Sequence, residues 1–171
     1  MRASWPGRRG DVVETRGGSM FTGVVWGEVL LPHDAGSGVN RVTFAPGSRT
    51  FWHRHQGGQM LIGYAGAGLV VTRDATAGIG EGAVVHAFAG EEHWHGALPG
   101  SFMSHQSIVL GGATDWLEEV SEEEYLAAVA SLPVLPGYLA PTEARPTATR
   151  PGSPRPEPAA RGGSPPPAPR V

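Results

Sequence analysis

The most informative segment of this chain is Gly47-Ser-Arg-Thr-Phe-Trp-His-Arg-His-Gln-Gly-Gly-Gln-Met-Leu-Ile-Gly-Tyr-Ala-Gly66. It places His53 and His55 two residues apart, and the side-chain amide of Gln59 follows four residues later. Side chains at positions i and i+2 of an extended strand leave the same face. We therefore expect both imidazoles to point into one cavity and to hold one metal ion.

A third histidine ligand is expected downstream, where Gly90-Glu-Glu-His-Trp-His-Gly-Ala97 offers two. His93 and His95 share the same strand phase, so from the residues alone either imidazole could face inward.

Cysteine and lysine are both absent from the chain. The first absence excludes disulfides, thiolate metal sites and cysteine nucleophiles, and the second excludes Schiff-base chemistry on an amine. No stretch is apolar for long enough to cross a bilayer. Residues 1–10 contain arginines but no apolar run behind them, so they do not read as a signal peptide. We expect a soluble cytoplasmic protein that does not contact a membrane.

Charge and composition divide the chain into three parts. Residues 11–140 carry fourteen Asp or Glu against five Arg. This acidic body lacks the basic face that phosphate binding needs, so nucleic acid is not expected as a partner. The C-terminal part is rich in Pro, Ala and Arg and buries too little apolar surface to offset its ordering entropy. We expect one domain over residues 13–132, a disordered extension over residues 1–12 and a disordered tail over residues 133–171.

Short β-branched runs with Gly and Pro turns fill the central part, which predicts an all-β sandwich or barrel. The expected strands span residues 21–31, 39–45, 50–55, 60–64, 68–72, 83–88, 93–97 and 102–110. Residues 77–80, Ala-Gly-Ile-Gly, are expected to form a turn. One helix is expected after the capping box at residues 121–124, with Tyr125, Leu126 and Val129 packed on the sheet.

Two motifs resemble the signature of the cupin family. The first is Gly, five residues, His-x-His, three or four residues, an acid, six residues and Gly. Residues 47–66 match every spacing, with Gln59 where most cupins carry Glu. Residues 82–97 fit the spacing of the second motif, with Phe88 in place of its Pro and Ala97 in place of its Asn. The resemblance implies a single-domain cupin, a double-stranded β-helix or jelly-roll barrel, with a short C-terminal helix.

A narrower resemblance links roughly residues 13–126 to the manganese-dependent bacterial hydroxynitrile lyases, a subgroup that includes carboxymuconolactone-decarboxylase-associated cupins. The segments that carry it are Phe21-Thr-Gly23, Val42-Thr-Phe44, His93-Trp-His-Gly-Ala97, Met103-Ser-His105 and Asp115-Trp-Leu-Glu-Glu119. The resemblance implies that His53, His55, Gln59 and His93 hold a divalent metal ion, with manganese preferred. Imidazole and amide donors also suit iron, nickel and zinc. A degenerate site that no longer binds metal is the alternative for Gln59.

The resemblance assigns His105 to proton exchange with the substrate beside the metal. An imidazole with an unperturbed pKa near 6.5 suits that role, and a buried core histidine is the alternative. The resemblance also places Asn40, Val42 and Val109 around the substrate pocket, although strand residues of these types also read as plain core. His95 is assigned to packing at the barrel mouth or to a supporting hydrogen bond.

Three functions are compatible with these residues. The leading hypothesis is an enzyme, a lyase that reversibly cleaves an α-hydroxynitrile to an aldehyde and cyanide. The first alternative is a mononuclear metal dioxygenase acting on a small aromatic or diketone substrate. The second is a non-catalytic accessory cupin that binds a small molecule.

Self-association is expected from the resemblance, since small cupins pair through an N-terminal strand that extends a neighbour's sheet. Residues 21–31 are the expected element of a homodimer or higher homo-oligomer. Arg49, Trp52 and Arg54 are assigned to the outer face or to such a contact.

Overall fold

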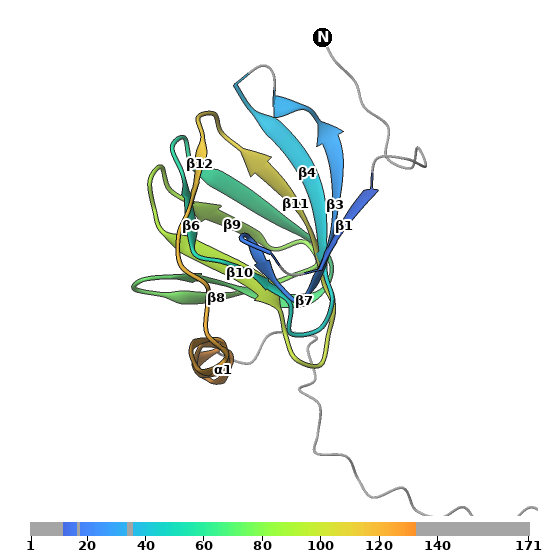
Figure 1. The fold of residues 1–171 in the computed structure, drawn as a ribbon, viewed down its shortest axis with the longest axis vertical. Helices are drawn as coiled ribbons and strands as arrows, with labels where there is room; N and C mark the ends of the chain where they lie inside the picture. The colour runs from blue at the N-terminus through green and yellow to red at the C-terminus, as the bar shows by residue number, and fades with distance from the viewer. Residues whose placement is uncertain (1–11, 17, 34–35, 133–171) are drawn as a thin grey trace, which may run out of the picture. The chain divides into compact units, whose positions relative to one another are not determined.

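Antiparallel strands form more than half of the described part of the chain and curve into a nearly closed barrel (Figure 1). The computed structural model describes residues 12–16, 18–33 and 36–132, with the backbone alone for residues 12–16. The expected disordered extension, apart from Val12, and the expected tail lie outside these residues. No helix among the described residues is long and apolar enough to span a membrane.

One side of the barrel consists of six strands in hydrogen-bonded order. They are β1 (Val12–Arg16), β3 (Val24–Leu31), β4 (Gly38–Phe44), β11 (Met103–Val109), β7 (Gln59–Thr72) and β9 (Val84–Ala87). Both edges of β3 are paired, with β1 on one side and β4 on the other. The end strands of this order are β1 and β9, and the self-association expected through residues 21–31 stays a prediction.

The other side of the barrel is built around β10 (His93–Ala97), which pairs with β5, β6 and β7. The remaining strands of this side are β2 (Phe21–Thr22), β5 (Arg49–Thr50), β6 (His53–His55), β8 (Thr76–Gly80) and β12 (Thr114–Trp116). The long strand β7 belongs to both sides, since its first half pairs with β11 and its second half with β10 and β8. It therefore closes the barrel along one edge.

The all-β prediction and most predicted strands are confirmed. The turn predicted at residues 77–80 is wrong, because these residues form most of β8, where Ile79 is fully buried against β7. The two strands predicted over residues 60–72 are one strand, and the strand predicted over residues 50–55 is interrupted between β5 and β6. Strands β1 and β12 were not predicted.

Two apolar clusters fill the fold. One lies inside the barrel and is formed by Val25, Phe44, Leu61, Val70, Ile79, Ala97 and Met103. The other lies between the sheet and helix α1 (Glu122–Ser131) and includes Trp52, Leu69, Trp94, Leu98, Val120, Tyr125 and Ala128. Strand β10 separates the two clusters, since Trp94 belongs to the outer one and Ala97 to the inner one, so its backbone is packed on both sides.

Helix α1 begins as predicted, with the Ser121 hydroxyl accepting a hydrogen bond from the Glu124 backbone N–H at 3.1 Å. Its buried face differs in one residue from the expected stripe. Tyr125 and Ala128 are buried, whereas Leu126 is half exposed and was wrongly predicted to pack on the sheet. Positions i and i+3 share a helix face, whereas i+1 turns away from it.

The helix also covers two side chains that were assigned to an outer surface. Arg49 is only 4% exposed; its guanidinium donates to the Val120 carbonyl oxygen and pairs with Glu122. Trp52 is 3% exposed and donates its indole N–H to Glu124 at 3.0 Å. Both face away from the barrel interior, but they attach the helix to the sheet and are not free for a dimer contact.

Candidate metal centre

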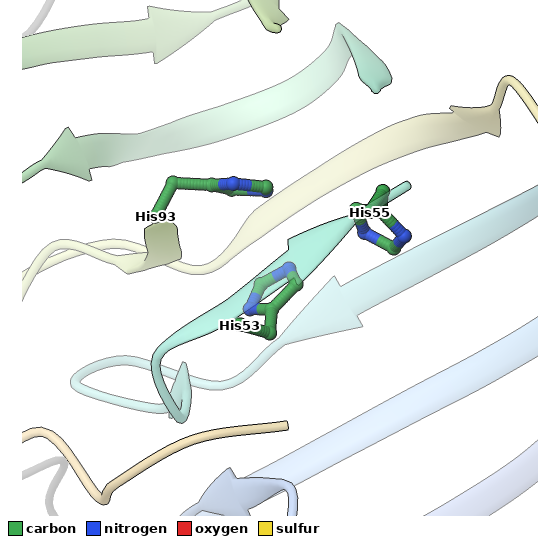
Figure 2. Close-up of side chains that lie close together, drawn as sticks. All are labelled: His53, His55 and His93. Atoms are coloured by element: carbon green, nitrogen blue, oxygen red, sulfur yellow. The ribbon is translucent and has the colours of Figure 1, made fainter. Parts of the chain in front are cut away.

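Three histidines meet inside the barrel (Figure 2). His53 and His55 come from β6 and His93 from β10, and one ring nitrogen of each lies within 4.8 Å of the others. The register of the two strands brings them together, because His53 and His93 are direct cross-strand partners. All three side chains are buried. The cluster predicted from the spacing in the sequence is therefore formed, and it could bind a metal ion.

Hydrogen bonds at the Nδ1 atoms orient the three rings. Nδ1 of His53 donates to the Phe51 carbonyl oxygen and Nδ1 of His93 to the Glu91 carbonyl oxygen, each at 2.9 Å. A carbonyl can only accept, so in the neutral rings the hydrogen lies on Nδ1 and the lone pair on Nε2. This is the tautomer in which Nε2 is free to bind a metal.

Gln59, at the start of β7, faces the same point. Its amide nitrogen donates to the Ser107 hydroxyl at 2.8 Å, which leaves its Oε1 atom 2.9 Å from Nε2 of His93. With the hydrogen of His93 on Nδ1, this orientation of the amide turns its oxygen toward the Nε2 lone pair, and a cation beside both atoms would stabilise it. Ligands lie roughly 2.1 Å from a transition metal, so two at a right angle are about 3 Å apart. The donor set fits a metal ion.

Burial keeps these imidazoles neutral. Desolvation lowers the pKa of His55 to about 4, and repulsion from His93 and His33 adds to the effect. The pKa of His53 is held well below its usual value, first by burial and then by His93. Burial also lowers the pKa of His93. Since a metal binds the neutral ring, the folded protein presents its ligands in the required form near neutral pH.

His105 lies on β11 and is fully buried, and neither of its ring nitrogens has a hydrogen-bond partner in the described part of the chain. Its ring stacks on Phe44 at 5.7 Å between centroids. Burial lowers the pKa of His105 to about 4, so the imidazole is neutral near neutral pH. A buried imidazole with two unsatisfied nitrogens is costly unless a ligand supplies a polar partner.

His95 was assigned from the sequence to packing at the barrel mouth or to a supporting hydrogen bond. It lies inside the barrel, 3% exposed, and its ring centroid is 5.3 Å from that of His53 and 4.8 Å from that of His105. Its Nδ1 atom has no hydrogen-bond partner among the described residues. The sequence did contain a signal for this inward position, because His95 shares the strand phase of His93. His95 thus connects the three-histidine cluster with His105.

The three residues assigned to the substrate pocket lie on β4 and β11. Val42 is the cross-strand partner of His105 and packs against the inner apolar cluster, and Val109 is buried. Asn40 is half-buried, and its amide nitrogen is 3.2 Å from Nε2 of His33. His33 is exposed.

Every arginine whose side chain is described pairs with a carboxylate. The pairs are Arg41 with Glu28, Arg49 with Glu122, Arg54 with Asp115 and Glu92, and Arg73 with Glu92 and Glu118. Among the described residues, no protein cation is therefore held ready for an anionic group of a bound molecule.

Comparison with known proteins agrees with this architecture. No family model matches the sequence. A relative named (R)-mandelonitrile lyase, from Granulicella tundricola, is 43% identical over 111 residues, which are 61% of this chain and 85% of the relative. The crystal structure of a cupin-like protein from Thermotoga maritima is 38% identical with a TM-score of 0.63, over 67% of this chain and 92% of that chain. The polyketide cyclase RemF from Streptomyces resistomycificus shares the fold alone, at 18% identity and a TM-score of 0.56 over 75% of this chain and 99% of that one. The chain belongs to the cupin family, as a small cupin that resembles the hydroxynitrile lyases.

Proposed function

We propose that this cupin is a metal-dependent lyase that reversibly cleaves an α-hydroxynitrile to an aldehyde and hydrogen cyanide. The observation that carries the proposal is the convergence of three neutral imidazoles and the Gln59 carbonyl oxygen on one point. A relative named mandelonitrile lyase supports the choice of reaction.

The proposed ligands are His53, His55, Gln59 and His93, and manganese is the preferred ion, with iron, nickel and zinc also compatible with the donors. When bound, the ion supplies Lewis acidity, which stabilises negative charge on a substrate oxygen or on cyanide. All four donors are neutral, so no carboxylate cancels part of the dipositive charge. A neutral donor set favours anion stabilisation over oxidation chemistry, which benefits from an electron-rich metal.

His105 is the proposed proton carrier. In the cleavage direction the substrate hydroxyl proton passes to a ring nitrogen of His105, and the carbon–carbon bond to the nitrile breaks. The electron pair of that bond leaves with cyanide, the aldehyde carbonyl forms, and the imidazolium returns its proton to cyanide. The ring is suited to this exchange because it is neutral and neither of its nitrogens is hydrogen-bonded to a described residue.

The proposed substrate is a neutral molecule with an apolar substituent. The interior beside His105 contains Phe44, Val42 and Met103, which favour an aromatic or aliphatic group. A carboxylate would find no arginine partner there, because the described arginines are paired elsewhere. An uncharged cyanohydrin such as mandelonitrile meets both conditions.

The test is cyanide release from mandelonitrile by manganese-loaded protein under anaerobic conditions, with benzaldehyde measured in parallel. We expect equal amounts of both products and no oxygen uptake when the assay is repeated in air. Substrate-dependent oxygen consumption without cyanide release would replace the lyase by a dioxygenase. No turnover of either kind by fully loaded protein would favour an accessory cupin.

A further inference from the structure

We propose that Thr114 is a positioning residue of the metal centre, because its hydroxyl sets the orientation and tautomer of His55. The hydroxyl oxygen lies 2.9 Å from Nδ1 of His55, and the Nε2 atom of that ring is buried without a hydrogen-bond partner among residues 18–33 and 36–132. The inference rests on the proposed metal site and names a residue outside both cupin motifs that tunes it.

His55 differs from the other two histidines in how its ring is held. His53 and His93 each donate to the backbone carbonyl oxygen two residues earlier in their own segment. His55 instead contacts a side chain 59 residues later in the sequence. A backbone carbonyl always accepts, but a hydroxyl can either accept or donate, so the tautomer of His55 depends on what Thr114 does.

Metal binding requires one of these two states. If the Thr114 hydroxyl accepts from Nδ1–H, the lone pair of the neutral ring lies on Nε2, which can then bind the ion. If the hydroxyl donates to Nδ1, the hydrogen lies on Nε2 and blocks coordination. We infer that Thr114 accepts, as the carbonyl partners of the other two rings do.

The short strand β12 holds Thr114 in place. Its three residues pair in register with β6, so that Thr114 is opposite His55, Asp115 opposite Arg54 and Trp116 opposite His53. Asp115 accepts a hydrogen bond from Arg54 Nε at 3.1 Å on the outer face. The Trp116 ring lies 4.8 Å from the His53 ring on the inner one. Each ligand of β6 is thus backed by a residue of β12.

A purely structural role for Thr114 predicts a different response to substitution. Valine has the shape of threonine and an equal preference for strands, so Thr114→Val removes the hydroxyl and little else. Serine keeps the hydroxyl but loses the methyl group. Strand packing alone would tolerate Val better than Ser, whereas a hydroxyl that sets the tautomer requires the reverse order.

The test is titration of metal-free protein with Mn²⁺ alone, with the dissociation constant measured in competition with a chelator. Thr114→Val should bind Mn²⁺ about 10- to 100-fold more weakly than the unaltered chain, the usual effect of losing such a partner, and Thr114→Ser within about threefold of it. Thr43→Val is the matched control, because it removes a hydroxyl contact of the same length, to Ser104, outside the histidine cluster. It should leave the affinity unchanged.

Equal affinity of Thr114→Val and the unaltered chain would overturn the role of Thr114 while leaving the metal site intact. A complete lack of Mn²⁺ binding by the unaltered chain would overturn the metal site and this role together. Nitrogen-15 NMR of the unaltered, zinc-loaded protein tests the same point without a variant. A hydrogen on Nδ1 of His55 supports the proposal, and its absence overturns it.

Discussion

The Oε1 atom of Gln59 lies 2.9 Å from Nε2 of His93, and both atoms are acceptors when His93 carries its hydrogen on Nδ1. In this orientation the amide nitrogen donates to the Ser107 hydroxyl, which leaves the amide oxygen toward His93. The fold thus holds two lone pairs at the separation of neighbouring metal ligands. The neutral amide, in a position where most cupins carry Glu, is the feature that separates the proposed chemistry from oxidation.

Replacing Gln59 by Glu tests the importance of that neutrality. A carboxylate can still bind the ion and can accept a hydrogen bond from Ser107, so Mn²⁺ should bind at least as tightly. One unit of positive charge is cancelled, so cyanide release from mandelonitrile should fall by about tenfold or more. Steady-state kinetics with metal content measured on the same sample check both parts. Undiminished cyanide release by fully metal-loaded Gln59→Glu would show that a neutral ligand is not required at this position.

His105→Ala should abolish most of the turnover while leaving the metal in place. General acid–base groups contribute about 10²- to 10⁴-fold, and His105 is not among the proposed ligands. Elemental analysis should give the same metal content as the unaltered chain. His86→Ala is a suitable control because His86 is an exposed histidine whose ring contacts Phe88, and it should retain full activity. Normal cyanide release by His105→Ala would end the proton-carrier role.

The sequence predicted the ligand cluster because its spacing is local. His53 and His55 needed only a strand period, and Gly90 located His93 through the second motif. Thr114 could not be found in this way, since its partner His55 is 59 residues earlier and β12 has only three residues. The residues of β8 carry the glycines of a turn and become a strand only through pairing with β7. In both cases the structure depends on a partner that is distant in the sequence, and the local residue pattern does not reveal that partner.

Acidification should destabilise the metal-free protein through its buried histidines. His105 has a pKa of about 4 in the folded chain against roughly 6.5 when unfolded. Between these pH values the unfolded chain binds a proton that the folded chain does not. The free energy of unfolding therefore decreases as pH falls below 6.5, and the decrease from this group is complete below pH 4. The difference corresponds to about 3 kcal/mol for this group alone.

Urea unfolding of metal-free protein at several pH values checks this sign. His105→Leu lacks the titrating ring, so its stability should fall less steeply over the same range. Parallel curves for the two proteins would contradict the expected linkage, as would a gain in stability of the unaltered chain on acidification.

Tyr125→Phe should lower stability without altering the metal centre. The phenol donates to the Ala97 carbonyl oxygen at 2.7 Å in a buried position, and it attaches helix α1 to the end of β10. Phenylalanine keeps the ring, including its contact with the Arg49 guanidinium, and loses the hydroxyl with its hydrogen bond to Ala97. The loss of a buried hydrogen bond costs about 1–2 kcal/mol. Because His93 lies at the opposite end of β10 and is held by the Glu91 carbonyl, Mn²⁺ affinity should remain that of the unaltered chain. Thermal unfolding and Mn²⁺ titration of the same preparation check both statements, and a weakened Mn²⁺ site would show that the helix positions the ligands after all.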